Sequence, residues 1–355
     1  MAYKKIQYGC SFADMAIQKY SRKNRNHIFL QEIDKTVDWE PIQALLLKHY
    51  EPGKSKLGEV AYPPLFLFKC LLLQKWFRIK SDPELESQIN DRISFRSFLG
   101  LPLEQASPDH STYSRFRKRL TKDAMIKINS ALLNQFHRLG YSINEGIAVD
   151  ARLVKSASRP VSNDQLKELK EKSLTMEGQL DKNGTRKKYS RDLDSDWSIK
   201  NDKPHFGLKE HTAVDTDNGF ILSTYMTPPS QNDSIHLPMV VISSMHTSDK
   251  IQKVYADKGY AGAPNRSFLA LNNIGDGIMR KDSKTAKLTE TESKRNKAIS
   301  KLRYIVEQYF GISHVHDNGQ RARFPEIMKN TIDIMFRQFA FNLRKGAKLF
   351  NVIPV

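Results

Sequence analysis

The spacing of hydrophobic positions changes along the chain near residue 145. Before this point, apolar residues recur every three or four positions, which is typical of amphipathic helices. Pro41, Pro64 and Pro83 each open one of these segments, and proline is tolerated in the first turn of a helix. The segment 108–140 follows with the same period and predicts one long helix that ends at Gly140.

After residue 145 the pattern becomes one of short strands. EGIAVDARLV, FGLKEHTAVD and GFILSTYM predict three strands, and the DTDNG between the last two predicts a hairpin turn. Strands at KVYAD and GDGIMR then alternate with helices, and the chain ends in helices at about 289–311 and 325–348. Thr289 and Glu292 have the spacing of a capping box at the start of the first of these helices. An antiparallel start followed by helical crossovers predicts a mixed α/β sheet of the ribonuclease-H-like type.

These patterns divide the chain of 355 residues into two expected domains. We expect an all-helical domain over 1–144 and an α/β domain over 145–350. The stretch 155–205 is rich in charged residues and poor in apolar ones. We interpret it as a polar, basic linker or insertion that is helical in part.

The charge of the chain indicates its partner. Lys and Arg number 57 against 39 Asp and Glu, a formal net charge of +18. Phosphate backbones of nucleic acids are the commonest partners of large basic proteins, although a solvated basic surface is the alternative. Cys10 and Cys70 have no metal-ligand spacing, and no apolar run resembles a signal peptide or a membrane span. We therefore expect a cytoplasmic protein without membrane attachment.

Three acidic residues stand in unusual surroundings. Asp150 interrupts an apolar strand, Asp257 ends a strand, and Glu307 lies on the helix predicted at 289–311 with Arg303 one turn away. Each has a structural alternative: a salt-bridged strand residue, a turn cap and a surface ion pair, respectively. Converging carboxylates instead hold hard divalent cations, usually Mg²⁺, and two such ions can activate water against a phosphodiester. The three acids together predict phosphoryl-transfer chemistry on nucleic acid.

Several blocks of the sequence resemble those of one enzyme family. VDARLV, HFGLKEHTAVDTDNGFI, YADKGYAG and RNKAISKLRYIVEQYFG resemble, in order and spacing, the catalytic blocks of bacterial DDE transposases of the insertion-sequence-five family, within the insertion-sequence-four-like group. PPLFLFKCLLLQKWF and PDHSTYSRFRKRL resemble the helical region that precedes them in that family. The resemblance covers residues 40–345 apart from the stretch 155–195.

The resemblance implies a catalytic triad of Asp150, Asp257 and Glu307. It implies a ribonuclease-H-like core that holds two Mg²⁺ or Mn²⁺ ions, with Asp150 shared between them and no small-molecule cofactor. The substrates would be double-stranded DNA, both the transposon ends and the target. The domain 1–144 would recognise the ends, a homodimer would form the synaptic complex, and the protein would associate with the bacterial nucleoid.

Basic side chains that could contact DNA lie in two places. The segment 111–122 carries five Lys and Arg and no acidic residue, and residues 280–303 carry nine Lys and Arg against three acids. At two positions of the family's helix signature, Ser300 stands in place of a Tyr and His314 in place of a Lys. The DNA-contacting residues that we expect are Arg115, Arg117, Lys118, Arg119, Lys258, Arg295, Arg303 and His314.

Two other functions remain open from the sequence. A metal-dependent nuclease would cut DNA without joining the cut ends to a target. A protein derived from an inactive transposase would bind DNA without cutting it. The presence of all three acids argues against the second alternative.

Overall fold

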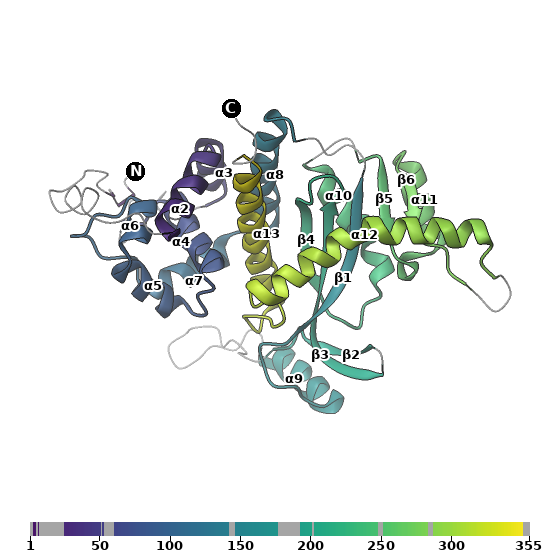
Figure 1. Cartoon of the computed structure of the whole chain (residues 1–355). Coiled ribbons are helices and arrows are strands. Elements are labelled where there is room, and N and C mark those ends of the chain that lie inside the picture. The colour runs from purple at the N-terminus through teal and green to yellow at the C-terminus, as the bar shows by residue number, and fades with distance from the viewer. Residues whose placement is uncertain are drawn as a thin grey trace. The chain divides into compact units, whose positions relative to one another are not determined.

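The structure, a computed structural model, divides the chain into two compact units. One comprises Met1–Ser142 with Met335–Val355, and the other comprises Ile143–Ile334. Figure 1 shows the first as helices and the second as a sheet with its own helices. The described residues are 3, 4, 6, 25–50, 52, 60–141, 146–176, 192–200, 202–247, 251–282 and 287–350.

The first unit is helical throughout its described residues, as the sequence predicts. Its helices are α2 (Arg25–Thr36), α3 (Glu40–His49), α4 (Pro64–Trp76), α5 (Asp82–Asp91), α6 (Ile93–Leu99), α7 (His110–Arg119) and α8 (Lys122–Arg138). The three prolines lie in the first turns of α3, α4 and α5. The prediction of one helix over 108–140 is wrong. Leu120 is extended, and the Thr121 side chain accepts a hydrogen bond from the Ala124 backbone N–H, so a new helix begins there.

The C-terminal helix α13 (Ile327–Phe350) supplies part of the core of the helical unit. The Phe68 ring lies 5.0 Å from the rings of Phe336 and Phe339, between centroids. Trp76 Nε1 donates to the Ala340 carbonyl at 3.0 Å. Residues 335–355 therefore group with the helical unit, whereas the sequence places the last helix with the sheet. The expected boundary at 144/145 lies outside the described residues.

The second unit is built on a mixed sheet with the order β2-β3-β1-β5-β6, in which β4 also pairs with β3. The pairs β1–β3, β2–β3 and β3–β4 are antiparallel, and the pairs β1–β5 and β5–β6 are parallel. Between β3 and β4, Gly219 has a φ of 71°, which suits the predicted hairpin turn. The strands are β1 (Ile147–Lys155), β2 (Asp196–Lys200), β3 (Lys203–Asp215), β4 (Ile221–Thr227), β5 (Lys253–Ala256) and β6 (Gly275–Ile278).

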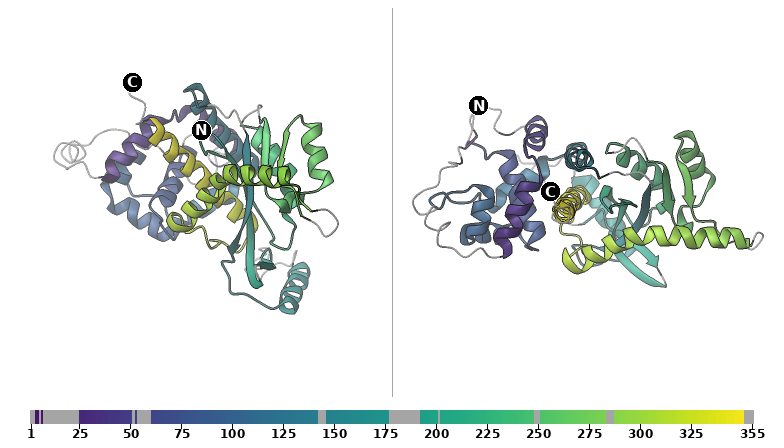
Figure 2. Two further views of the ribbon diagram at one scale, coloured as in Figure 1. Left: turned by 45° about the vertical axis from the view of Figure 1, so that its right-hand side comes forward. Right: turned by 45° about the horizontal axis from the view of Figure 1, so that its top comes forward.

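Three helices pack on this sheet, α10 (Leu237–Met245), α11 (Ala263–Leu271) and α12 (Glu290–His316). The unit also contains α9 (Asn163–Met176) and short 3₁₀ turns at Asp233–His236 and Lys258–Tyr260. Figure 2 shows α12 crossing the strands, and it packs on β1, β5 and β3. The expected capping box of Thr289 and Glu292 is present at its start. Among the described residues, no helix combines the length and the apolar composition needed to cross a membrane.

The polar stretch 155–205 is more ordered than a linker at its two ends. Its first half contains α9, and its last residues form β2, an edge strand that the sequence analysis misses. Trp197 of β2 donates from Nε1 to the Val161 carbonyl at 2.8 Å and packs against Phe206. The tryptophan therefore holds the two ends of the stretch together. Residues 177–191 lie outside the described part of the chain.

Candidate active site

Two of the three expected carboxylates come from neighbouring strands. The parallel pairing of β1 and β5 sets Ala148 opposite Tyr255. Continuing this register by two residues sets Asp150 opposite Asp257, so both lie on the same face of the sheet. Asp257 follows the last residue of β5 and caps the next turn, where its Oδ1 accepts from the Gly259 N–H at 2.7 Å. This turn fixes the direction in which the carboxylate leaves the strand.

Helix α12 brings Glu307 and Arg303 to the same region. Arg303 Nη2 donates to Asp150 Oδ2 at 2.9 Å, and the guanidinium is 10% exposed. In the sequence, Arg303 lies one turn from Glu307, a spacing that also suits an exposed ion pair on the helix surface. Arg303 is instead buried, while Glu307 is exposed. The ion pair with Asp150 explains the difference, because it makes burial of the arginine tolerable.

The electrostatics of Asp150 reflect these neighbours. Its pKa is raised to about 6, first because burial penalises the carboxylate and further because Asp257 and Glu307 repel its charge. Arg303 and the Ala151 N–H lower it. The charges of Asp257 and Glu307 thus act on Asp150, although the three residues are distant in sequence. The structure brings the three predicted acids into one electrostatic cluster.

The donor set suits a hard divalent cation. All three side chains offer carboxylate oxygens, the ligands that Mg²⁺ and Mn²⁺ prefer, and their mutual repulsion favours a bound cation. The carboxylate oxygens of Asp150, Asp257 and Glu307 do not all lie within 4.8 Å of one another in this structure. Arg303 is the cation that pairs with Asp150 in this structure.

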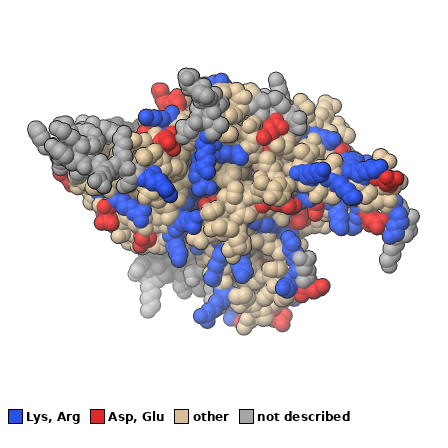
Figure 3. Space-filling view, viewed as in Figure 1, with Lys and Arg blue, Asp and Glu red and all other residues tan. Residues whose placement is uncertain are grey.

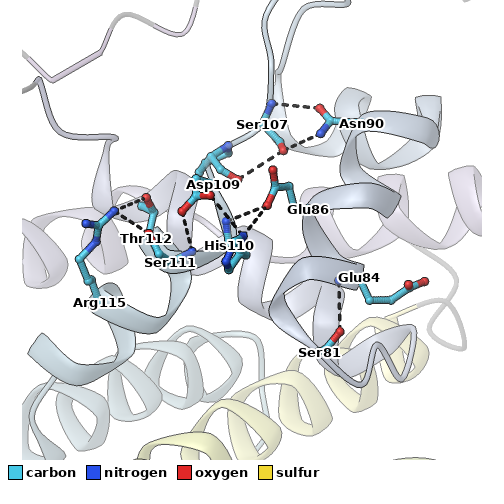
Figure 4. Close-up of polar contacts among 11 residues, drawn as sticks. Ser81, Glu84, Glu86, Asn90, Ser107, Asp109, His110, Ser111, Thr112 and Arg115 are labelled. Atoms are coloured by element: carbon cyan, nitrogen blue, oxygen red, sulfur yellow. Dashed lines mark hydrogen bonds and ion pairs between the residues drawn. The ribbon is translucent and has the colours of Figure 1, made fainter.

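A tighter group of possible metal ligands occurs in the helical unit. Glu86, Asp109 and His110 form the group of three among the described residues whose ligand atoms lie within 4.8 Å of one another. Figure 4 shows the His110 ring between the two carboxylates. Glu86 Oε2 accepts from the His110 N–H at 2.8 Å, and Asp109 Oδ1 accepts from the Ser111 N–H at 2.8 Å. These hydrogen bonds cap α7 and join it to α5, which gives the cluster a structural role.

A buried polar network that the sequence analysis misses fixes α12 on the sheet. Arg152 of β1 pairs with Glu210 of β3 through its Nη2 and Oε2 atoms at 2.7 Å. The same guanidinium donates to the Phe310 carbonyl at 3.2 Å and to Ser313 Oγ at 2.8 Å, both on α12. Tyr309 donates to Glu210 Oε1 at 3.1 Å. The only sequence signal is a lone Glu within the predicted strand FGLKEHTAVD.

This network lies beside the carboxylates. Arg152 is two residues beyond Asp150 on the same face of β1, and its acceptors on α12, in Phe310 and Ser313, follow Glu307 by three and six residues. Glu210 is completely buried. The network therefore sets the rotation and the height of α12 over β1, and with them the place of Glu307.

Five of the expected DNA-contacting residues are exposed. They are Arg115, Lys118, Arg119, Lys258 and His314. Arg115 and Lys118 lie on α7 in the helical unit, and His314 lies on α12 in the sheet unit. Figure 3 shows further Lys and Arg side chains along α12. These positions stay predictions for DNA contact.

Three of the arginines expected to contact DNA have hydrogen-bond partners within the protein. Arg117 is 3% exposed and pairs with Asp82, with Nη1 and Oδ2 2.9 Å apart. Arg295 donates to the carbonyls of Ile278 and Asp276 at 2.9 and 2.7 Å, which ties α12 to β6. Arg303 pairs with Asp150, as described above. DNA contact by these three arginines stays a prediction, and their guanidinium groups also have the partners named above within the protein.

Comparison with known proteins identifies the family. The family model described as Transposase DDE domain matches residues 142–343, and that described as Transposase domain (DUF772) matches residues 17–119. The transposase for insertion sequence element IS1106 of Neisseria meningitidis serogroup B is 32% identical over 238 residues, 66% of this chain and 77% of that protein.

Two solved structures show weaker similarity. The piggyBac transposase synaptic complex with hairpin DNA has a TM-score of 0.42 at 10% identity, covering 93% of this chain and 77% of that chain. The Mos1 mariner paired end complex with Mn has a TM-score of 0.20 at 10% identity, covering 95% and 92%. Because the DDE model spans more than half of the sequence and the IS1106 relative is matched over most of its length, the chain belongs to the insertion-sequence DDE transposases and is a DNA transposase.

Proposed function

We propose that this transposase binds the terminal inverted repeats of an insertion sequence and catalyses both strand cleavage and strand transfer. Asp150, Asp257 and Glu307 form its catalytic triad. The observation that carries the proposal is the electrostatic cluster, in which the charges of Asp257 and Glu307 act on the half-buried Asp150, which is paired with Arg303. Groups with such perturbed protonation gather at functional sites more often than elsewhere.

The catalytic unit has a ribonuclease-H-like fold, and the chain belongs to the insertion-sequence-five family. The fold is supported by three antiparallel strands that are neighbours in the sheet, β1, β3 and β4, and by the parallel strands β5 and β6 on the other side of β1. The family is supported by the blocks VDARLV, YADKGYAG and RNKAISKLRYIVEQYFG.

Two divalent cations, Mg²⁺ or Mn²⁺, would be held by the three carboxylates, with Asp150 shared between them. Bound there, such ions would activate the attacking oxygen and stabilise the leaving oxygen of a phosphodiester. Asp150 lies on β1, Asp257 directly follows the adjacent strand β5, and Glu307 lies on the helix that packs on both strands. Two of the three ligands are thus held on regular elements, and the third is held by the capped turn at the end of a strand.

Other side chains of the site prepare it for DNA. Arg303 keeps the Asp150 carboxylate ionised and oriented through their ion pair. Lys258, exposed and next to Asp257, is placed to contact a phosphate of the strand that is cut. His314, exposed on α12 seven residues after Glu307, contacts the DNA backbone further along the same helix.

The helical unit recognises the transposon ends, and two copies of the chain act together. Arg115, Lys118 and Arg119 present an exposed basic surface on α7 for this purpose. A homodimer would hold both ends in the synaptic complex while they are joined to target DNA in the nucleoid. These steps follow from the chemistry of transposition, since both ends of one element must be joined together.

The experiment that tests the proposal follows the fate of cut ends. Purified protein is incubated with Mg²⁺, labelled DNA from the borders of its own element, and a supercoiled target plasmid. We expect cut 3′ ends to become covalently joined to the plasmid. Cleavage without joining would contradict the strand-transfer proposal and favour a metal-dependent nuclease. Binding without cleavage would indicate an inactive transposase-derived protein.

A further inference from the structure

A cavity of about 510 Å³ lies next to the candidate active site, within the sheet unit. Its walls are the end of β1, the beginning of β3 and the C-terminal half of α12. This volume lies in the range of cavities that bind small organic groups. It is therefore large enough for a single nucleotide.

The cavity lies further along β1 and α12 than the triad residues that these two elements carry. Arg152 lines it and is two residues beyond Asp150 on the same face of β1, which corresponds to roughly 7 Å. Phe310, Gly311 and His314 line it from α12, and they follow Glu307 by three, four and seven residues. These spacings keep them on the side of the helix that carries Glu307. A DNA strand whose phosphate lies at the triad would reach the cavity with a neighbouring nucleotide.

The charge of the cavity favours an anion. Lys155, Lys200, His205 and His314 line it, and no Asp or Glu does. Lys155, Lys200 and His314 are exposed, and no ion pair of theirs occurs among the described residues. Lysine and histidine donors without acidic neighbours are suited to phosphate oxygens.

The cavity also has an aromatic and apolar lining. Phe206 is buried, and Phe310 is half-buried with the Arg152 guanidinium 5.0 Å from the centre of its ring. Leu153, Val154 and Leu208 also belong to the apolar part of the wall. Bases of single-stranded nucleic acids stack on such aromatic surfaces while basic groups bind the phosphates. The combination of lysines and phenylalanines fits a whole nucleotide better than an isolated phosphate.

We propose that this cavity binds one nucleotide, base included, of the DNA strand that passes the triad. The inference rests on the proposed function, because it takes the strand at Asp150 as its starting point. It adds a site that positions the strand by its base and phosphate, outside the carboxylate cluster.

Gly311 offers a direct way to test the cavity. It lies within α12, and a Cβ added to it would meet no heavy atom within 4 Å. Alanine is therefore expected to fit without a clash and to favour the helix over glycine. Leucine at the same position would extend into the open space of the cavity. Gly311→Ala is thus the matched control for Gly311→Leu.

The experiment compares two single strands of equal length, oligothymidine and a base-free abasic oligomer, by fluorescence anisotropy with the full chain in EDTA. We expect wild type to bind oligothymidine about tenfold more tightly than the abasic strand. This preference should persist in Gly311→Ala and be lost in Gly311→Leu. An equal preference in Gly311→Leu, or none in wild type, would overturn the proposal.

A second variant tests the charge of the cavity without narrowing it. In Lys200→Gln, the slope of log affinity against log salt for oligothymidine should fall by about 0.7, the value for one lost phosphate contact. An unchanged slope would contradict a phosphate contact at the cavity. A parallel Mg²⁺ cleavage assay on wild type tests the proposed function separately, so failure of one inference is distinguishable from failure of the other.

Discussion

Asp150→Ala is expected to reduce Mg²⁺-dependent DNA cleavage by about a thousandfold or more, since stabilisation by the bound cations is worth several kcal/mol. Asp150 is the carboxylate on which both other acids act, and its ion pair with Arg303 is the closest charge contact recorded in the cluster. DNA binding should be retained, because the exposed basic residues of α7 are unchanged. Cleavage is measured on end DNA in single-turnover reactions, and binding by gel shift.

Two further variants distinguish the loss of a metal-binding carboxylate from a general loss of the folded structure. Asp150→Asn keeps the shape of the side chain and should be nearly as inactive as Asp150→Ala. Glu290→Gln removes an exposed acid of α12, whose partner is Lys294, and should cut DNA at the wild-type rate. Normal cleavage by Asp150→Asn would remove Asp150 from the proposed triad.

Arg152→Met is expected to lower the free energy of unfolding by about 3–5 kcal/mol, because it leaves a buried carboxylate without its partner. Glu210, the partner, is completely buried, and Arg152 also donates to two groups of α12. The loss is measured by urea denaturation. Loosening of α12 should also slow cleavage at temperatures at which the variant remains folded, since Arg152 positions the helix that carries Glu307.

A second substitution tests whether the unpaired Glu210 carboxylate causes the loss of stability. Adding Glu210→Gln to Arg152→Met removes the unpaired charge and should recover part of the lost stability. Lys172→Met, which removes an exposed ion pair with Glu168, should leave the midpoint of urea denaturation close to that of wild type. Equal stability of Arg152→Met and Lys172→Met would show that the network does not hold α12.

The elements around the triad could be predicted because their signals are local. The hairpin turn after Asp215 and the capping box of Thr289 follow from the spacing of a few neighbouring residues, and both are present. The alternation of strands and helices also predicted a mixed sheet. The position of Asp150 opposite Asp257 depends on the parallel pairing of two strands, which the order of elements only suggests.

What the sequence could not reveal depends on partners far along the chain. Arg117 belongs to a basic segment typical of DNA contact, but its partner Asp82 lies 35 residues earlier. Arg152 and Glu210 are 58 residues apart and become neighbours only through the register of β1 and β3. The last part of α13 packs with the helical unit because aromatic residues of α4 match its apolar face. Local periodicity carries no information about such pairings.

The central claim is that three distant acids form one metal centre, and metal-directed cleavage of the protein backbone tests it most directly. Fe²⁺ replaces Mg²⁺, and ascorbate with peroxide then generates radicals that cut the chain beside the bound ion. We predict cuts near residues 150, 257 and 307 together, suppressed by excess Mg²⁺ and absent in Asp150→Asn. Cuts confined to the Glu86, Asp109 and His110 cluster, or cuts that persist in Asp150→Asn, would contradict the claim.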